Sequence, residues 1–251
     1  MSIKEIIEAV VAVVSYTGKS GKSTVSNNLL YPRLKNAKIF RIETINESGF
    51  SGAGDNEQKL KGRDIEKLLI ELVKTQSAIV DVGTSNVESF VLGLTQQPES
   101  HRIFDYFIVP IEANAAKVNE FKEAVKTITM LNKLGVEPDR IKVIFNKLAA
   151  DNEIEDEMVR IFNFHKENPI FTLNRHAVIH DTQAFKSLAD SKKSYSDALL
   201  DKTDYWEIIK ETHISDEQER VKFIKMARTQ GLIYGLNKEL DSVFEALFGK
   251  I

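Results

Sequence analysis

The string TGKSGKST at residues 17–24 constrains the fold of this chain most, because of what stands on either side of it. The apolar run Val10–Val14 precedes the string, and Thr24–Leu30 has the pattern of a short helix that ends at Pro32. A loop between a buried strand and a helix points backbone N–H groups and the helix N-terminus at one place, which suits a phosphate group. The string therefore predicts a phosphate-binding loop after the first strand of an α/β sheet; an ordinary turn rich in Gly, Lys and Ser is the alternative.

The chain departs from the usual phosphate-loop pattern, G-x-x-x-x-G-K-[ST], at one position. Gly21, Lys22 and Ser23 complete the pattern, but Tyr16 stands where the first glycine is usual. That position precedes the tight part of the loop, so a side chain fits there if it points away from the phosphates. We expect Lys22 to neutralise the β and γ phosphates and Ser23 to ligate Mg²⁺. The other loop residues expected to contact the nucleotide are Gly18, Lys19, Ser20, Gly21 and Thr24.

A phosphate loop needs a carboxylate for its metal at the end of a neighbouring strand. In SAIVDVGTSN, Asp81 ends an apolar run, and we expect it to hold the water shell of Mg²⁺; a strand-end cap is the alternative. Gly83 lets the backbone approach the γ-phosphate, which Gly83 and Thr84 are expected to sense. Glu43 follows another apolar run and is expected to position the attacking water or hold a metal water, with a turn or salt-bridge role as the alternative.

Recognition of the base is expected from the other side of the sheet. In IKVIFNKLAAD, Asn146 and Lys147 directly follow an apolar run, and Asn146 is the candidate for contact with the base. Guanine-specific proteins use N-K-x-D, and Ala149 stands at the place of the Asp. The pattern therefore favours adenine and ATP, although an Asn after a strand is also a common turn residue.

Short apolar runs alternate with helical patterns, which indicates a doubly wound, mainly parallel sheet with helices on both faces. The expected strands are Val10–Ser15, Ala37–Ile42, Ser77–Val82, Tyr106–Ile111, Ile141–Phe145 and Pro169–Leu173. Helices are expected from about Asp64 to Lys74 and after Asn114, a plausible N-cap. The glycine-rich segment 49–62 is expected to be a mobile loop.

Beyond about Ser191 the alternation stops, and Asp204–Leu247 has the pattern of helix. Leu236, Leu240, Val243 and Leu247 form a stripe for packing on the chain's own domain or on a partner. Tyr205 and Trp206 are expected to anchor this helical region. We therefore predict a P-loop domain over residues 1–200 and a C-terminal helical extension, residues 201–251, packed on it.

Composition narrows the classes of protein further. With 251 residues, 42% of them hydrophobic, the chain suits one large domain and a tail. Ala9–Val14 is the longest apolar run, far short of the roughly 20 residues of a membrane span, and no signal-type segment is evident, so a cytoplasmic location is expected. The absence of Cys excludes disulfides and thiol ligands. A net charge of -3 gives no general attraction to nucleic acid.

These motifs, in this order, resemble the ParA/MinD class of P-loop ATPases, and within it the plasmid stability proteins. The likeness covers residues 9–150 well and the rest more loosely, and LYPR and ETIN are its most specific parts. It rests on SYTGKSGKSTVSNNLLYPRLKNAKIFRIETINES, IVDVGTSNVESFV, FDYFIVPIEA, KTITMLNKLGV and VIFNK. The resemblance implies an ATPase that uses ATP and Mg²⁺, a homodimer formed with ATP, and a part in plasmid partition or conjugative DNA handling. It also implies a plasmid-encoded protein partner, with DNA bound directly or through that partner.

One departure from the class bears on activity. ParA and MinD proteins carry a lysine two residues into the loop signature that reaches the partner's phosphates, and Thr17 stands there in this chain. Lys19 replaces it only if the backbone turns it toward a partner; solvent exposure is the alternative. Without such a lysine, hydrolysis is expected to be slow or partner-stimulated. The remaining alternatives are a metabolic P-loop kinase or ATP-dependent ligase, and a nucleotide-binding scaffold with little hydrolysis.

Overall fold

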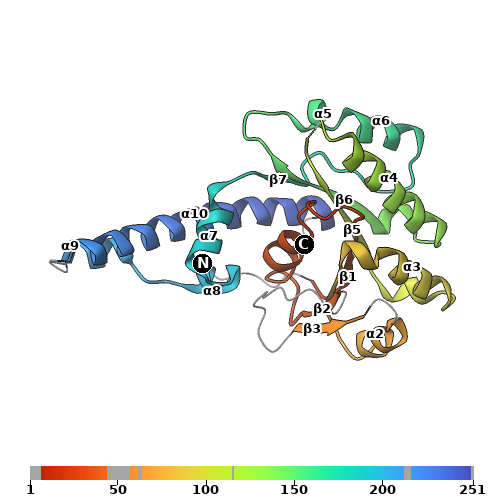
Figure 1. Ribbon diagram of the computed structural model, residues 1–251, viewed down its shortest axis with the longest axis horizontal. Helices are drawn as coiled ribbons and strands as arrows, with labels where there is room; N and C mark the ends of the chain where they lie inside the picture. Colours follow the sequence, from red (N-terminus) through yellow and green to blue (C-terminus); the bar gives the residue numbers. More distant parts are fainter. Residues whose placement is uncertain (1–6, 44–56, 62–63, 115, 212–215, 250–251) are drawn as a thin grey trace. The chain divides into compact units, whose positions relative to one another are not determined.

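The computed structural model describes residues 7–43, 57–61, 64–114, 116–211 and 216–249 (Figure 1). The chain divides into two compact units. One unit, called the sheet unit here, holds the described residues up to 181 together with 242–249. The other, called the helical unit, holds the described residues between 182 and 241. The predicted boundary near residue 200 stays a prediction.

A seven-stranded sheet, with every neighbouring pair parallel, forms the centre of the sheet unit, in the order β3-β2-β4-β1-β5-β6-β7. The strands are β1 Val10–Val13, β2 Lys38–Ile42, β3 Glu57–Leu60, β4 Ala78–Val82, β5 Tyr106–Glu112, β6 Ile141–Leu148 and β7 Val178–His180. This confirms the predicted doubly wound α/β fold. Because β1 lies between β4 and β5, the loops that follow these strands meet at one edge of the sheet, the usual ligand site of such folds.

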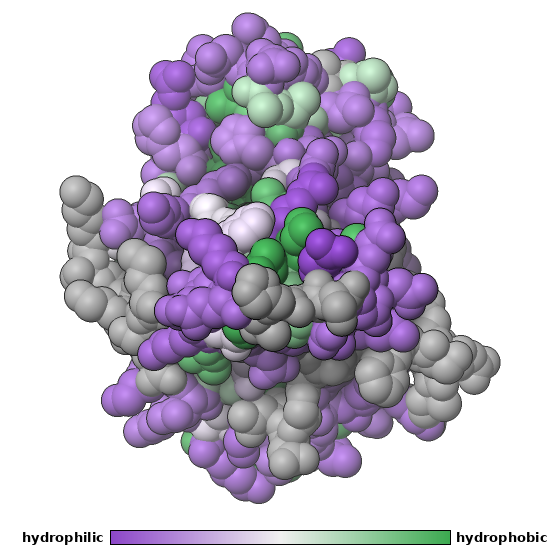
Figure 2. All heavy atoms as spheres, turned by 90° about the vertical axis from the view of Figure 1, so that its left-hand side faces the viewer, coloured by the Kyte–Doolittle hydropathy of each residue, from purple (hydrophilic) through white to green (hydrophobic). Residues whose placement is uncertain are grey.

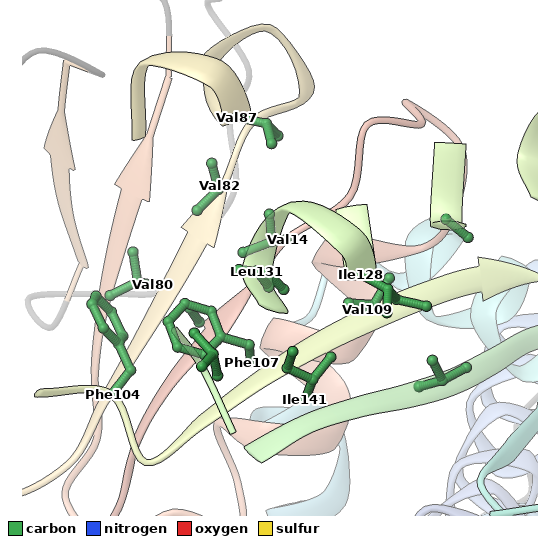
Figure 3. Close-up of a cluster of buried hydrophobic side chains, with 14 of the residues drawn as sticks. Val14, Val80, Val82, Val87, Phe104, Phe107, Val109, Ile128, Leu131 and Ile141 are labelled. Carbon is green, nitrogen blue, oxygen red and sulfur yellow. The ribbon is translucent and has the colours of Figure 1, made fainter. Parts of the chain in front are cut away.

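Both faces of the sheet are buried. On one face, Phe107 and Val109 of β5 lie with Ile128 and Leu131 of α4 in a continuous apolar cluster (Figure 3). The helices that pack on this face are α2 Ile65–Leu72, α3 Val87–Thr95, α4 Val118–Lys133, α5 Ile154–Glu157 and α6 Val159–Glu167. The other face is covered in part by a π-helical segment, η1 Val25–Leu30, whose Leu29 and Leu30 are fully buried.

Short helical turns complete the sheet unit, and four helices make up the helical unit. The turns are α1 Lys22–Thr24, η2 Thr84–Asn86, η3 Ser100–Ile103 and η4 Pro138–Arg140. The helices are α7 Gln183–Ser191, α8 Tyr195–Leu200, α9 Tyr205–Glu211 and α10 Glu217–Phe248, whose last turns from Ser242 belong to the sheet unit. None of the helices in the described ranges combines the length and apolar character that crossing a bilayer requires.

Two sequence expectations about strands are corrected. Pro169–Leu173 is not a strand, because only Thr172 pairs with β6, opposite Lys142, and the last strand is β7. Within the expected loop 49–62, Glu57–Leu60 is β3, which pairs with β2; residues 49–56 and 62 lie outside the described ranges. The helix expected after Asn114 begins at Val118, and Asn114 instead accepts a hydrogen bond from the Ala116 N–H through its side chain.

The C-terminal helices match the predicted helical region, and the four residues of the apolar stripe are buried within this chain. Tyr205 is buried as expected, but Trp206 is 53% exposed and does not anchor the helix. Figure 2 looks at the left-hand side of Figure 1, where hydrophilic side chains predominate and hydrophobic ones appear in small separate patches. The exposed large apolar residues of the helical unit are Leu200, Trp206, Val221 and Ile224.

Candidate nucleotide-binding site

Lys22, the lysine of the predicted phosphate loop, lies inside the loop after β1. Its ammonium donates hydrogen bonds to the Ser15 carbonyl at 3.3 Å, to the Thr17 carbonyl at 2.6 Å and to the Thr84 hydroxyl at 2.8 Å. Burial lowers the pKa of Lys22, and the negative charge of Asp81 opposes that change. A buried ammonium is therefore held among neutral oxygens, a position from which it can exchange these partners for phosphate oxygens.

The Thr17 carbonyl is a shared acceptor within the loop. It accepts from Lys22, from the Thr84 hydroxyl at 3.2 Å and from the Ser20 hydroxyl at 3.4 Å. The Thr17 side chain lies 3.0 Å from the Ser15 hydroxyl, so it is used inside the loop. Lys19 has an exposed side chain, and its carbonyl accepts a hydrogen bond from Lys147 at 2.9 Å.

Asn146 lies against the loop from the end of β6. It is 2% exposed, its side-chain amide donates to the Ser20 carbonyl at 3.1 Å, and its side-chain oxygen accepts from the Lys147 N–H at 3.0 Å. Gly21 has φ +88, and a Cβ at this position would overlap the Asn146 amide, so both the backbone conformation and the close approach require glycine. In this structure Asn146 holds the loop after β1 through the Ser20 carbonyl; its contact with adenine stays a prediction.

Arg41, the fourth of the five residues of β2, could not be identified as a site residue from the sequence. It is 3% exposed, and its guanidinium contacts Asp81 at 2.8 Å, Glu57 at 2.5 Å and the Asn27 side-chain oxygen at 2.8 Å. The sequence contains one indication of this cluster, because an arginine inside the apolar run KIFRI would be buried and a buried charge needs partners. Its partners come from distant parts of the chain, so the sequence did not identify them.

Asp81 lies near the end of β4, beside β1 and β2, as expected. Burial raises the pKa of the Asp81 carboxyl, and the neighbouring guanidinium of Arg41 opposes that change. One Asp81 oxygen is committed to Arg41, and Ser23 is exposed at the start of α1. Mg²⁺ makes few contacts with the protein when phosphates and water supply its other ligands. The Ser23 hydroxyl and the Asp81 carboxylate, one oxygen of which is paired with Arg41, fit such a site.

The other predicted site residues follow β2 and β4. The Gly83 N–H donates to the Ile42 carbonyl at 2.9 Å, and a Cβ on Gly83 would lie 2.8 Å from that oxygen, so the close approach of the two strand ends requires glycine. Thr84 comes next and reaches Lys22. Glu43 donates its N–H to the Leu60 carbonyl at 3.1 Å, and its carboxylate lies 3.6 Å from the Lys59 ammonium.

Glu120, in the first turn of α4, is a second residue that the sequence analysis missed. Its charge acts on Lys22, raising the pKa of that lysine against the effect of burial. One Glu120 carboxylate oxygen is buried and has no hydrogen-bond partner among the described residues. A glutamate in a polar helical turn carries no sequence signal that distinguishes it from a solvent-exposed one.

Comparison with known proteins supports the fold. No protein-family model and no curated protein matches this chain. A solved structure of apo McdA from Cyanothece has 14% identity and a TM-score of 0.50, and the match covers 92% of this chain and 99% of that one. A complex of a variant of the same McdA with ATP matches at 14% identity and a TM-score of 0.44, over 93% and 96% of the two chains. A plasmid partition protein from Borrelia burgdorferi, bound to AMPPNP, matches at 10% identity and a TM-score of 0.44, over 88% and 98%.

Proposed function

We propose that this chain is an ATP-binding, Mg²⁺-dependent switch ATPase of the ParA/MinD type. ATP closes two subunits face to face, and hydrolysis or release separates them. The observation that carries the proposal is the position of Lys22, whose buried ammonium is held by the loop after β1 and by Thr84 after β4. The loop and Thr84, the residue expected to sense the γ-phosphate, therefore both contact the Lys22 ammonium. The likeness of the fold to McdA agrees with this proposal.

Each site residue then has a part in the proposed reaction. Lys22 neutralises β and γ oxygens, and Ser23 with Asp81 places Mg²⁺, which supplies charge stabilisation to the transferring phosphate when it is bound. Gly83 and Thr84 sense the γ-phosphate. The residues proposed to line the nucleotide beside them are Gly18, Lys19, Ser20, Gly21, Thr24 and Asn146.

Glu43 is the proposed residue for positioning water, and it lies at the end of β2 close enough for its charge to raise the pKa of Asp81. The local sequence at residues 43–46 is also part of the likeness to plasmid stability proteins. Within the ParA/MinD class we propose that the chain is closest in function to StbB, acting in the cytoplasm in plasmid stability or conjugative DNA handling. A plasmid-encoded protein and DNA are the partners that this assignment implies.

A nucleotide-binding scaffold with little hydrolysis is the second candidate, and Thr17 favours it. The Thr17 side chain is engaged with Ser15, and no lysine occupies its position to reach a partner's phosphates. Dimerisation by a nonhydrolysable ATP analogue with negligible turnover would support the scaffold. Turnover that begins only when a small molecule is added would instead indicate a metabolic kinase or ligase.

The test is the molar mass in solution, by light scattering, of the wild type and of Lys22→Ala. Each is measured without nucleotide, with ADP and Mg²⁺, and with a nonhydrolysable ATP analogue and Mg²⁺. We expect the mass to double only with the ATP analogue and only in the wild type, because the γ-phosphate completes the interface. An unchanged mass in all three states would contradict the dimer switch.

A further inference from the structure

A groove lies between α3 and α4 of the sheet unit. Its volume is about 690 Å³, and it is separate from the loop that holds Lys22. Its apolar lining consists of Val91, Leu94, Pro98, Met130 and Leu134. A concave apolar surface between two helices is the form that receives one face of an amphipathic segment.

The charged groups on this groove are mainly positive. Lys126 and Lys133 lie on its lining from α4. The carboxylate among the described lining residues, Glu99, lies 2.9 Å from Arg102 in an exposed and therefore weak pair, so it lowers the positive charge of the groove without reversing it. Lys126 reaches Glu88 at 3.4 Å, and because both side chains are more than half exposed, this pair is weak and exchangeable. An apolar floor with available ammonium groups is complementary to an acidic amphipathic peptide.

Two residues that line the groove also hold Tyr16, the residue that replaces the first glycine of the loop pattern. The Lys126 ammonium lies 3.8 Å from the centre of the Tyr16 ring, and the Tyr16 hydroxyl donates to the Met130 sulfur at 3.3 Å. Tyr16 stands between Ser15 and Thr17, whose carbonyls accept from Lys22. A ligand that draws Lys126 away or displaces Met130 therefore alters the packing at the start of the phosphate loop.

We propose that the groove between α3 and α4 docks an acidic amphipathic segment of a protein partner, and that Tyr16 transmits its binding to the phosphate loop. The inference rests on the proposed function, since it assigns a regulatory surface to the same nucleotide site. Tyr16 then has a positioning role: its side chain provides a contact with α4 that a glycine at this position could not make.

The docking surface is tested with a phage-displayed library of random 16-residue peptides selected on the wild-type protein. We expect the selected peptides to combine aliphatic residues with Asp and Glu. Their affinity, measured by fluorescence anisotropy, should fall about tenfold or more in Lys133→Glu, because the added carboxylate repels them. Lys122→Glu is the matched control, since Lys122 is an exposed lysine of α4 outside the groove lining. Selected peptides that are not acidic, or that bind Lys133→Glu as well as wild type, would overturn the proposal.

The link through Tyr16 is tested with a selected peptide and a fluorescent ATP analogue. Saturating peptide should change the affinity of the wild type for the analogue by about fivefold or more, the usual range of allosteric coupling. Tyr16→Leu should still bind the peptide but lose this shift, and Tyr16→Phe, which keeps the ring under Lys126, should retain part of it. An equal shift in Tyr16→Leu would exclude the link. Failure of the wild type to bind the analogue without peptide would instead refute the proposed nucleotide site and leave the peptide result standing.

Discussion

At the scale of single residues, Arg41 shows what the sequence could and could not indicate about the site. Lys22, Asp81 and Thr84 each follow or end an apolar run that predicts a strand. The sequence therefore predicted that they lie at the same edge of the sheet. The pairing of Arg41 with Glu57 and Asp81 joins residues 16 and 40 positions apart, across three strands. Such a pairing depends on the order of strands in the sheet, which no local pattern contains.

Replacing Arg41 with Met should strongly destabilise the protein. The substitution leaves the buried carboxylates of Asp81 and Glu57 without their cation, and breaking a buried pair in this way costs about 3–5 kcal/mol of the free energy of unfolding. Urea denaturation followed by circular dichroism measures the loss. Arg102→Met is the control, because its pair with Glu99 is exposed and should contribute less than about 1 kcal/mol. A similarly small loss for Arg41→Met would show that the buried cluster does not hold β2 and β3 together.

At the scale of elements, the strands differed in how well the sequence predicted them. The strands β1, β4 and β5 are buried on both faces, so each is a nearly continuous apolar run and was located within a few residues. The edge strand β3 reads EQKL and is only partly buried, so it has no apolar run to detect. The other edge strand, β7, has three residues, too few to establish a period.

In the helical unit, Asp201 joins the end of α8 to α9 and α10. Its carboxylate accepts from the Lys193 ammonium at 2.7 Å and from the Tyr205 hydroxyl at 2.6 Å. Its carbonyl accepts from Gln230 at 2.8 Å and from the Tyr234 hydroxyl at 3.0 Å. The hydrogen bonds from Lys193 and Tyr205 hold the pKa of Asp201 well below its usual range.

This lowered pKa predicts how the stability of the helical unit depends on pH. A carboxyl whose pKa is lower in the folded state stabilises that state above its unfolded pKa, about 3.9, and the contribution is lost as pH falls toward the folded value. The melting temperature of Asp201→Asn should therefore lie below that of the wild type at pH 7, and the difference should shrink below about pH 4. Asp190→Asn is the control, a carboxylate of the same unit for which the described residues provide no hydrogen bond. A gap between wild type and Asp201→Asn that is constant from pH 7 to pH 3 would contradict the assignment.

At the scale of the whole molecule, the candidate nucleotide site belongs to one unit. The loop after β1, Thr84 after β4 and Asn146 near the end of β6 all lie at the carboxyl edge of the sheet. The helical unit contributes none of the described residues assigned to the nucleotide. We therefore expect nucleotide binding to order the sheet unit and to leave the helical unit unchanged.

Hydrogen exchange with mass spectrometry tests this distribution. At about 100 times its Kd, a nonhydrolysable ATP analogue with Mg²⁺ stabilises a binding-competent state by about 2.7 kcal/mol. Exchange should slow in residues 15–24, whose N–H groups then donate to phosphate, and in residues 81–86, which contain Thr84. Residues 183–211 should be unchanged at a protein concentration too low for dimers, and Lys22→Ala should show no slowing anywhere. Equal slowing in both units at that concentration would mean that the helical unit takes part in binding the nucleotide, because a site confined to the sheet edge protects only the amides that it contacts or orders.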